Sequence, residues 1–516
     1  MNRPIRKVAA AMGVLLVALF INLNFIQVVK GNSYRNDPDN LRVLLTEYSS
    51  PRGQIVVQGS PVALSVPTTD SLKYLRKYPQ GPIYAAMTGY YSFIYGTSAL
   101  ENAENSVLSG NDSRLIGRQL ADLLTGRNNR GGSVVLTLNR AAQTAAYEGL
   151  KLPNGTFKRG AVVALDPTTG AILAAVSTPS YDPSVLSSHD PVKIRAAYAK
   201  LINDPAQPML NRAFNQLYAP GSVFKVIVSA EALKQGFKPT QQIPAPNSYW
   251  PNGGSGPCPT DHPTACIQNF DGETCFNGKT AALQFALAKS CNTAFSSLAV
   301  DKLGGDAIAE EATLFGFDTG SLDVPLGVSA STVGSAEDLA DPAALAQTAI
   351  GQRDVRMTPL QGAMIAAAVA NEGQRATPYL VSQQRGPNLA LLQGPPNPQF
   401  TQVLDSQLDQ QLRDMMIGVV TSPEGTGGAA NITDIPGVVV GGKTGTADTG
   451  IFKNGVQTPP HAWFSGFALQ NGTAKIAVAV IVENGGVNGN ETTGGQAAAP
   501  IAKDVMEAYL HSLAGH

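Results

Sequence analysis

The longest apolar stretch of the chain runs from Val8 to Val29, close to the N-terminus. At 1.5 Å per residue, about 22 helical residues span about 33 Å, enough to cross the ~30 Å hydrocarbon core of a bilayer. Arg3, Arg6 and Lys7 precede the run, and such cations favour a cytoplasmic N-terminal tail with the remaining chain outside. We expect a tail over residues 1–7 and a single-pass anchor over 8–29. A cleaved signal peptide is the alternative, but it usually has a shorter apolar core and a small-residue cleavage site.

Two pairs of apolar runs, far apart in the chain, have the pattern of β-hairpins. Residues 160–183 contain two runs of strand-forming residues around the turn sequence Pro-Thr-Thr-Gly. Residues 461–484 contain two more, separated by a turn with Asn471-Gly472, the strongest short hairpin signal. The Ala- and Leu-rich region between them, about residues 190–420, is predicted to be mostly helical, and residues 499–513 predict a final helix. Strands at both ends with helices between them indicate an α+β domain whose sheet unites distant segments.

The first part of the chain outside the anchor has weaker patterns. Alternation over Gln54 to Val57 predicts a strand, and residues 134–138 predict another, followed by Asn139 as a helix N-cap and a helix over 141–150. Residues 70–132 have no clean period and indicate an elongated, non-catalytic module. Farther along, residues 384–400 and 421–434 are rich in Gly, Pro and polar residues, and we expect surface loops there.

Composition narrows the function classes. The 516 residues suggest two to four domains at roughly 100–200 residues per domain. Lys and Arg number 37 against 38 Asp and Glu, and this balance argues against a nucleic-acid-binding protein, which usually carries a basic excess. There are 5 His, without a His-Glu-x-x-His or Cys-x-x-Cys motif, so a zinc hydrolase is disfavoured.

The cysteines fit an oxidising compartment outside the cytoplasm. Cys258, Cys266, Cys275 and Cys291 lie within 34 residues, and four cysteines allow three pairings that sequence cannot decide. Cys258 and Cys266 share one Pro- and Gly-rich loop, so we expect that pair. Cys275 with Cys291 would then pin the loop to the element after it. Free buried thiols are the alternative.

Ser222 and Lys225 form the first of three short motifs that carry chemistry. Pro220-Gly221 breaks the chain and an apolar helix follows, so Ser222 is expected at a helix N-terminus. Residues three apart on a helix share a face, which places the Lys225 amine beside the Ser222 hydroxyl. A serine becomes nucleophilic when a neighbouring base takes its proton, and a lysine serves as that base when its pKa is lowered.

The other two motifs are Ser290-Cys291-Asn292, after a predicted helix, and residues 443–446 (Lys-Thr-Gly-Thr), after an apolar run that predicts a strand. Gly445 would let a substrate approach the strand backbone closely, and a strand edge can pair with an extended peptide. Each motif alone has a structural alternative: a helix cap for Ser222, a polar turn for Ser290 and a solvated strand end for Lys443. Their order and local context together favour a catalytic site.

On these three motifs the sequence resembles the penicillin-binding proteins, a family of serine acyltransferases related to the serine β-lactamases. The resemblance extends to residues 350–373 and 461–467. Two features resemble class B of this family, the monofunctional D,D-transpeptidases: the sequence Arg52-Gly53-Gln54-Ile55 and the short segment before the catalytic part. Among class B proteins, the chain resembles the actinobacterial elongation or septation type. That segment leaves no room for the glycan-polymerising domain of class A. One departure is Val56-Val57-Gln58-Gly59, where the family has Asp-Arg-x-Gly.

The resemblance implies an α+β fold with three parts. The first is the transmembrane helix, the second an elongated N-terminal pedestal over residues 30–156, and the third a transpeptidase domain over 157–516. In the last, an antiparallel five-stranded sheet is expected to be sandwiched by helices.

The family's mechanism can be carried onto these residues. Ser222 would attack the carbonyl of the penultimate D-alanine of a peptidoglycan stem peptide, and Lys225 would be the acylation base. Ser290 would relay a proton toward the leaving D-alanine amine, and Asn292 would hold the peptide amide and Lys225. The amine of a second stem peptide would then take the acyl group.

The third motif would serve the substrate's carboxylate. Lys443 would keep Lys225 neutral and attract the terminal carboxylate, which the hydroxyls of Thr444 and Thr446 would bind. The backbone N–H groups of Ser222 and Thr446 would form the oxyanion hole.

The expected partners are stem peptides ending in D-Ala-D-Ala, β-lactams, the plasma membrane and a SEDS-family glycan polymerase, with no nucleic acid. No metal or organic cofactor is required.

Three alternative functions stay open. A serine β-lactamase would need a Glu-bound water, and neither Glu310-Glu311 nor Glu337-Asp338 has the Asn partner expected there. A D,D-carboxypeptidase, as the main or a side activity, would use water as the acceptor. A scaffold would act through its anchor and N-terminal module alone.

Overall fold

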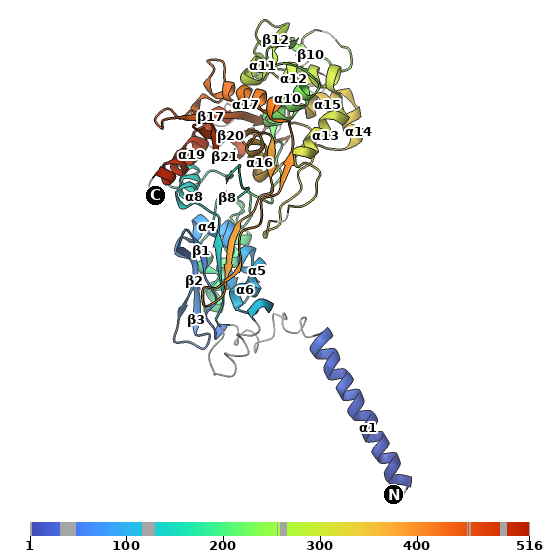
Figure 1. The fold of residues 1–516 in the computed structure, drawn as a ribbon, viewed down its shortest axis with the longest axis vertical. Coiled ribbons are helices and arrows are strands. Elements are labelled where there is room, and N and C mark those ends of the chain that lie inside the picture. Colours follow the sequence, from blue (N-terminus) through green and yellow to red (C-terminus); the bar gives the residue numbers. More distant parts are fainter. Residues whose placement is uncertain are drawn as a thin grey trace.

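The N-terminal helix stands outside the folded part of the chain in the computed structural model (Figure 1). α1 (Arg3–Asn24) continues as a π-helical turn, η1 (Phe25–Val29), and no residue of α1 is buried. The helix is long and apolar enough to cross a membrane over Arg3–Gln27, in agreement with the expected anchor. The structure describes residues 3–30, 48–115, 130–254, 256–258, 266–322, 324–450, 452–453, 456–485 and 493–514.

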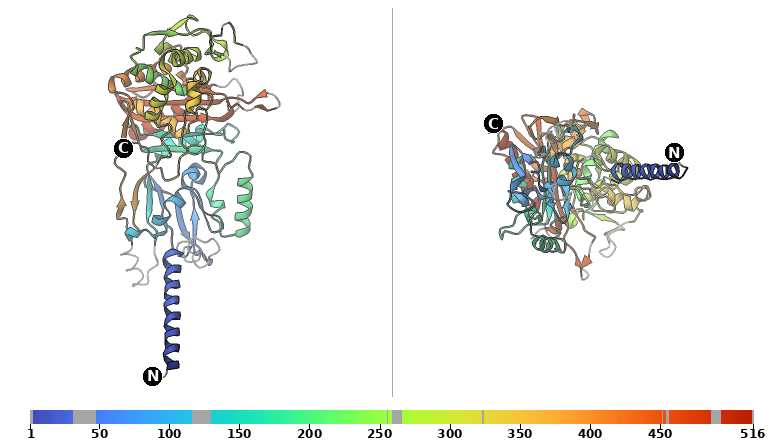
Figure 2. Two further views of the ribbon diagram at one scale, coloured as in Figure 1. Left: turned by 90° about the vertical axis from the view of Figure 1, so that its right-hand side faces the viewer. Right: turned by 90° about the horizontal axis from the view of Figure 1, so that it is seen from below.

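Beyond this helix, a smaller unit lies against one end of a larger one (Figure 2). We call the smaller unit the pedestal. Residues 31–47 and 116–129 of the predicted pedestal lie outside the described residues. Its centre is a six-stranded sheet with the order β15-β14-β6-β1-β2-β3. The strands are β1 (Ile55–Val57), β2 (Ser60–Pro67), β3 (Tyr74–Lys77), β6 (Ser133–Leu136), β14 (Val381–Arg385) and β15 (Leu391–Gln393). The helices are α4 (Gly81–Thr88), α5 (Ala99–Ala103) and α6 (Asn105–Ser109), and a small hairpin joins β4 (Tyr91–Ser92) to β5 (Gly96–Thr97).

The prediction of a surface loop over residues 384–400 is wrong. This segment contains the end of β14, all of β15 and the first residue of β16 (Phe400–Gln402). β14 pairs antiparallel with β6, which also pairs in parallel with β1. All of β14 is half-buried and most of it is polar, so no alternation is visible in its sequence. Its strand structure depends on a partner about 250 residues away in the chain, which local patterns do not report.

The Arg52-Gly53 dipeptide forms part of the pedestal core. Arg52 and Arg76 both pair with the fully buried Glu101, at 2.6 and 2.7 Å, and the Tyr78 hydroxyl donates to the same carboxylate. Burial alone would raise the pKa of Glu101, but the two guanidinium groups lower it overall. At Gly53 a Cβ atom would lie 1.5 Å from the Gly132 carbonyl oxygen, so only glycine fits there.

The larger unit is built on a five-stranded antiparallel sheet with the order β17-β20-β21-β7-β8. The strands are β7 (Gly160–Leu165), β8 (Ile172–Thr178), β17 (Val438–Ala447), β20 (His461–Gln470) and β21 (Thr473–Val482). Both predicted hairpins are confirmed. The second turns at Asn471-Gly472, where both φ angles are positive, at 51° and 77°. The pairing of β21 with β7 unites the two ends of the unit, as the α+β prediction requires.

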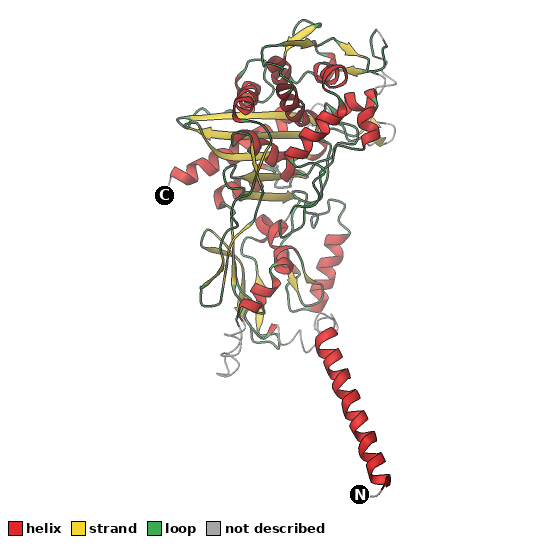
Figure 3. Ribbon diagram, turned by 45° about the vertical axis from the view of Figure 1, so that its right-hand side comes forward, coloured by secondary structure: helices red, strands yellow, loops and turns green. Residues whose placement is uncertain are grey.

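Helices cover both faces of this sheet (Figure 3). Along β7, Val162 and Ala164 pack with α8 (Arg140–Gly149) and α19 (Ala499–Ala514). The alternate residues Ala161 and Val163 pack with α16 (Pro359–Ala370) on the other face. Successive strand residues point to opposite faces, so a sheet buried on both sides is apolar at every position. The capping prediction is confirmed because the Asn139 side chain accepts from Ala142 N at the start of α8.

A further helical layer lies beyond α16 and holds most of the remaining chain. It contains α10 (Lys225–Lys234), α11 (Leu283–Lys289), α12 (Asn292–Leu298), α13 (Gly305–Phe315), α14 (Ala336–Ala340), α15 (Pro342–Thr348) and α17 (Ser406–Thr421). α9 (Pro191–Ile202) packs beside the pedestal, and α18 (Gly494–Ala497) precedes α19.

Short strand pairs interrupt the region predicted to be mostly helical. They are β9 (Gln242–Pro244) with β12 (Thr280–Ala282), β10 (Ser248–Tyr249) with β11 (Ile267–Gln268), and β13 (Gln374–Ala376) with β16. A last pair, β18 (Phe452–Lys453) with β19 (Val456–Gln457), follows β17. Both expected disulfides, Cys258–Cys266 and Cys275–Cys291, are present.

A buried carboxyl group on α17 makes stability depend on pH. Asp409 is fully buried, and neither of its carboxyl oxygens has a hydrogen-bond partner in the described chain. Burial raises the pKa of Asp409 from 3.8 to about 8. The folded state therefore keeps a proton that the unfolded state releases above about pH 4, and stability falls as pH rises from 4 to 8.

We expect Asp409→Asn, which cannot ionise, to raise stability at pH 7.5 by about 2–4 kcal/mol, since one pKa unit corresponds to about 1.4 kcal/mol. Thermal unfolding of both proteins at pH 7.5 and pH 4 measures this, and the gain should vanish at the lower pH. An equal gain in stability at both pH values would contradict ionisation of the buried Asp409 as the cause.

Candidate active site

Ser222 lies in a tight turn that leads into α10. The turn is a 3₁₀ segment, η4 (Gly221–Phe224), so the predicted position at a helix N-terminus is confirmed with a tighter first turn. Gly221 has a φ of 54°, and a Cβ atom there would lie 2.6 Å from the Thr446 carbonyl oxygen of β17. Glycine thus lets the turn pack directly on β17. Ser222 itself is partly exposed and lines a cavity of about 370 Å³.

Lys225 is the first residue of α10 and is fully buried. Its Nζ donates to Ser290 O and to Asn292 Oδ1, both at 2.7 Å, and lies 3.4 Å from Ser290 Oγ. Burial, together with the positive charge of Lys443, holds the pKa of Lys225 well below its usual range. A buried amine in this state has the character of a base at neutral pH.

Ser290 and Asn292 reach Lys225 because the chain turns sharply after α11. Ser290 adopts the left-handed conformation, with φ 65° and ψ 38°, which is uncommon for a residue other than glycine. This turn directs both the carbonyl and the hydroxyl of Ser290 toward the two lysines. Asn292 begins α12, and its Nδ2 donates to Gln268 O at 3.0 Å.

Lys443 lies inside a strand, whereas the sequence indicated a strand end. β17 continues to Ala447, and Lys443 pairs with Ser465 of β20. The strand is uninterrupted because Gly441 and Gly442 leave room for aromatic rings of β20 that a Cβ atom would contact within about 2.5 Å. Lys443 is fully buried, and its Nζ donates to Ser290 Oγ at 2.8 Å and to Thr444 O at 3.0 Å. Burial lowers the pKa of Lys443 to about 7.

The rest of the third motif extends along the cavity. Thr444 and Thr446 line it, and Thr444 Oγ1 is hydrogen-bonded to Thr426 Oγ1 at 2.6 Å. At Gly445 a Cβ atom would lie 2.7 Å from the Pro220 carbonyl oxygen, so this glycine is required by contact with the turn that carries Ser222. Close approach of a substrate to Gly445 stays a prediction.

A network of charged and aromatic groups supports the Ser222 turn from behind. Glu483, which directly follows β21, accepts from the Tyr218 hydroxyl and from Arg212 Nε, both at 2.8 Å, and pairs with Arg159 at 2.9 Å. Burial alone would raise the pKa of Glu483, but Arg212 and the other partners lower it overall. Glu483 therefore ties the segment before Ser222 to the central sheet.

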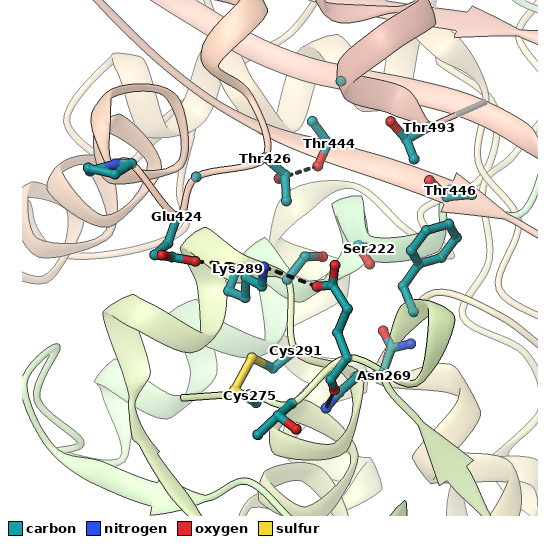
Figure 4. Close-up of a pocket in the computed structure, with 18 residues that line it drawn as sticks. Ser222, Asn269, Cys275, Lys289, Cys291, Glu424, Thr426, Thr444, Thr446 and Thr493 are labelled. Atoms are coloured by element: carbon teal, nitrogen blue, oxygen red, sulfur yellow. Dashed lines mark hydrogen bonds and ion pairs between the residues drawn. A yellow bond between two sulfur atoms is a disulfide. The ribbon is translucent and has the colours of Figure 1, made fainter. Parts of the chain in front are cut away.

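The cavity also has lining residues that the motifs did not indicate (Figure 4). They include Glu273, Lys289, Glu424, Thr426 and Thr493. None had a local signal. Glu424 and Thr426 lie in a segment with the pattern of a loop, Lys289 precedes the Ser290 motif without belonging to it, and Glu273 and Thr493 are distant from every motif in the sequence.

The alternative acids, Glu310-Glu311 and Glu337-Asp338, do not line the cavity, and Glu311 pairs with Lys234 on the far end of α10. Within the described residues, no group of three or more His, Cys, Asp or Glu is placed to hold a metal ion.

Two family models match the chain. The penicillin-binding protein transpeptidase domain matches residues 160–507, and the penicillin-binding protein A dimerisation domain matches residues 52–134.

Relatives of the same length are similar along the whole sequence. The chain is 44% identical over 513 residues to the peptidoglycan D,D-transpeptidase PbpA of Mycolicibacterium smegmatis, and 42% identical over 510 residues to PbpA of Mycobacterium tuberculosis H37Rv, covering 99% of each chain in both comparisons. Among solved structures, the ceftriaxone acyl-enzyme complex of penicillin-binding protein A from M. tuberculosis is similar with a TM-score of 0.82 and 42% identity, over 90% of this chain and 100% of that one.

Proposed function

This chain belongs to the penicillin-binding protein transpeptidases, and from that membership we propose that Ser222 is the nucleophile of its reaction. The protein is a class B peptidoglycan D,D-transpeptidase that works through a serine acyl-enzyme and is acylated by β-lactams. The observation that carries the assignment to Ser222 is the convergence of all three motifs on one cavity. Ser222 lines it, and the hydrogen-bonded chain Lys225–Ser290–Lys443 lies beside it.

Acylation begins with attack of Ser222 Oγ on the carbonyl carbon of the penultimate D-alanine. Lys225, neutral because its pKa is lowered, takes the hydroxyl proton. The backbone N–H groups of Ser222 and Thr446 receive the oxyanion, and removing one such donor costs about 3–4 kcal/mol in enzymes where it has been measured. Ser290 passes a proton to the leaving D-alanine amine as the peptide C–N bond breaks. Its contacts with both lysines support this relay role.

Transfer completes the cross-link. The amine of a second stem peptide attacks the ester carbonyl, a new amide bond forms, and the Ser222 oxygen recovers its proton. Asn292 holds Lys225 and the peptide amide, while Lys443, Thr444 and Thr446 bind the terminal carboxylate of the donor peptide. The positions of the two threonines on the cavity wall support this.

We assign residues 1–7 to the cytoplasm, 8–29 to the membrane, 30–156 to the pedestal and 157–516 to the transpeptidase domain outside the plasma membrane. The cations before the anchor support this orientation. Two segments cross the proposed boundary: α8 packs on β8 and α19 of the transpeptidase domain, and β14–β15 complete the pedestal sheet. The pedestal and anchor bring the protein to a SEDS-family glycan polymerase that makes the strands to be cross-linked.

The test is covalent capture of benzylpenicillin. We expect the full chain in detergent to form a stable adduct whose mass equals protein plus intact penicillin, and proteolytic mapping to locate it on the peptide that contains Ser222. Protein first unfolded in guanidinium is the control and should not react.

A stable adduct on another residue would contradict the assignment to Ser222. Rapid hydrolysis of penicillin without a lasting adduct would indicate a β-lactamase. Absence of both reactions would indicate a scaffold.

A further inference from the structure

Three charged residues outside the motifs form an ion-pair bridge across the cavity (Figure 4). Lys289 Nζ lies 3.0 Å from Glu273 Oε2 and 3.7 Å from Glu424 Oε2. The two carboxylate side chains are about half exposed, at 54% each, whereas the lysine is 27% exposed. The neighbouring Glu273 and Glu424 carboxylates raise the pKa of Lys289, so its ammonium stays charged. We call this group the Lys289 bridge.

The wall that carries Glu273 is fastened to the Ser290–Asn292 turn. The disulfide Cys275–Cys291 joins the two segments two residues after Glu273. Asn292 Nδ2 donates to Gln268 O at the start of the same wall. The disulfide and this hydrogen bond therefore hold the wall and the turn together.

The wall that carries Glu424 is fastened both to α11 and to β17. Thr426 N donates to Ala288 O at 3.2 Å, and Thr426 Oγ1 is hydrogen-bonded to Thr444 Oγ1 on β17. Glu424 thus belongs to the side of the cavity that holds Lys443 and the predicted carboxylate-binding threonines. Between the two walls, at the end of α11, lies Lys289.

The Ser290 turn needs support from both sides. Its left-handed backbone is costly for a residue that is not glycine and persists where the surroundings hold it. Ser290 must also keep its oxygen atoms within reach of Lys225 and Lys443, which lie on different elements. Lys289 directly precedes this turn, and its side chain pairs with a carboxylate of each wall.

We propose that Lys289 is a positioning residue for acylation. By pairing with Glu273 and Glu424 it holds the two walls at a fixed separation and keeps the Ser290 turn in register with both catalytic lysines. The inference rests on the proposed function of the site.

The test compares three variants in their reaction with benzylpenicillin, with noncovalent binding and the acylation step separated by stopped-flow kinetics. We expect Lys289→Gln to slow the acylation step about tenfold with little change in noncovalent binding, because small misplacements of catalytic groups act on the chemical step. Lys289→Arg keeps the charge and should stay within about twofold of wild type.

The third variant combines Lys289→Gln with Glu273→Gln and Glu424→Gln. It lacks the bridge but leaves no unpaired carboxylate, and we expect it to remain slow. Full recovery in this variant would overturn the proposal, because Lys289 would then act only by neutralising the two carboxylates. A wild-type rate in Lys289→Gln would overturn it as well.

Unfolding temperatures measure whether each variant is folded. If Lys289→Gln does not fold, Glu424→Gln replaces it, because this change breaks only the longer, exposed pair. We expect it to slow acylation about threefold, and an unchanged rate would overturn the proposal. Failure of the wild-type protein to form any adduct would instead contradict the proposed function.

Discussion

Replacing Lys225 with Gln is expected to lower the rate constant for acylation by benzylpenicillin about 10³-fold, within the range that a positioned general base contributes. Gln is slightly shorter than Lys but keeps N–H donors for the acceptors at this position, Ser290 O and Asn292 Oδ1, while the basic amine is lost. The variant should also lose the pH dependence that the base creates. In the wild-type protein the lowered pKa of Lys225 makes the rate rise with pH until the amine is fully neutral.

The measurement is the second-order acylation rate constant from pH 5 to pH 9 for wild type and variant. Lys238→Gln is the matched control, because Lys238 is exposed just beyond the same helix and should have no effect. An unchanged rate in Lys225→Gln would remove Lys225 from the mechanism and leave the proton of Ser222 without an assigned acceptor.

The second large effect is expected for Lys443→Met. This change should lower the acylation rate constant about 10²-fold, because it removes a buried, charge-assisted contact with the ligand carboxylate. It should also change the pH profile. A positive neighbour disfavours protonation of Lys225, so the pKa of Lys225 rises when Lys443 is removed. The rising limb of the profile therefore moves to higher pH in the variant.

The wild-type profile should also fall at high pH. Because the pKa of Lys443 is about 7 in the free protein, its charge is lost above that value and capture of an anionic ligand weakens. Lys443→Arg, which stays charged, should lack this falling limb. A penicillin methyl ester, which has no free carboxylate, is the ligand control, and Lys443→Met should be much less impaired with it. Equal losses with the acid and the ester would contradict carboxylate binding by Lys443.

The elements that sequence predicted well are those with strong local signals. The hairpins at Asn471-Gly472 and around residue 168, the capped helix after Asn139 and the final helix each follow from a turn or a period within about 20 residues. The strands of the two hairpins belong to one sheet that is buried on both faces. Their apolar runs are therefore long enough to recognise in the sequence.

The site was predictable to the extent that its chemistry lies in short motifs. Ser222 with Lys225, and Ser290 with Asn292, are close in sequence, and the order and local context of the three motifs favoured a catalytic site. What could not be predicted depends on contacts between distant segments. Lys289, Glu273 and Glu424 come from three loops or helix ends, and no spacing in the sequence links them. The continuation of β17 through Lys443 likewise depends on β20, which follows later in the chain.

Residues 381–393 lie within the transpeptidase sequence but form two strands of the pedestal sheet. The pedestal and the transpeptidase domain are therefore not separate segments of the chain. A gene cut at residue 156 would separate β6 from β14 and β15, and β6 would become an edge with unpaired backbone groups. The pedestal is thus encoded in two separate stretches, with most of the transpeptidase sequence between them. Exchanging one pedestal for another by recombination would require both stretches to be exchanged together. The two units are therefore inherited as one piece.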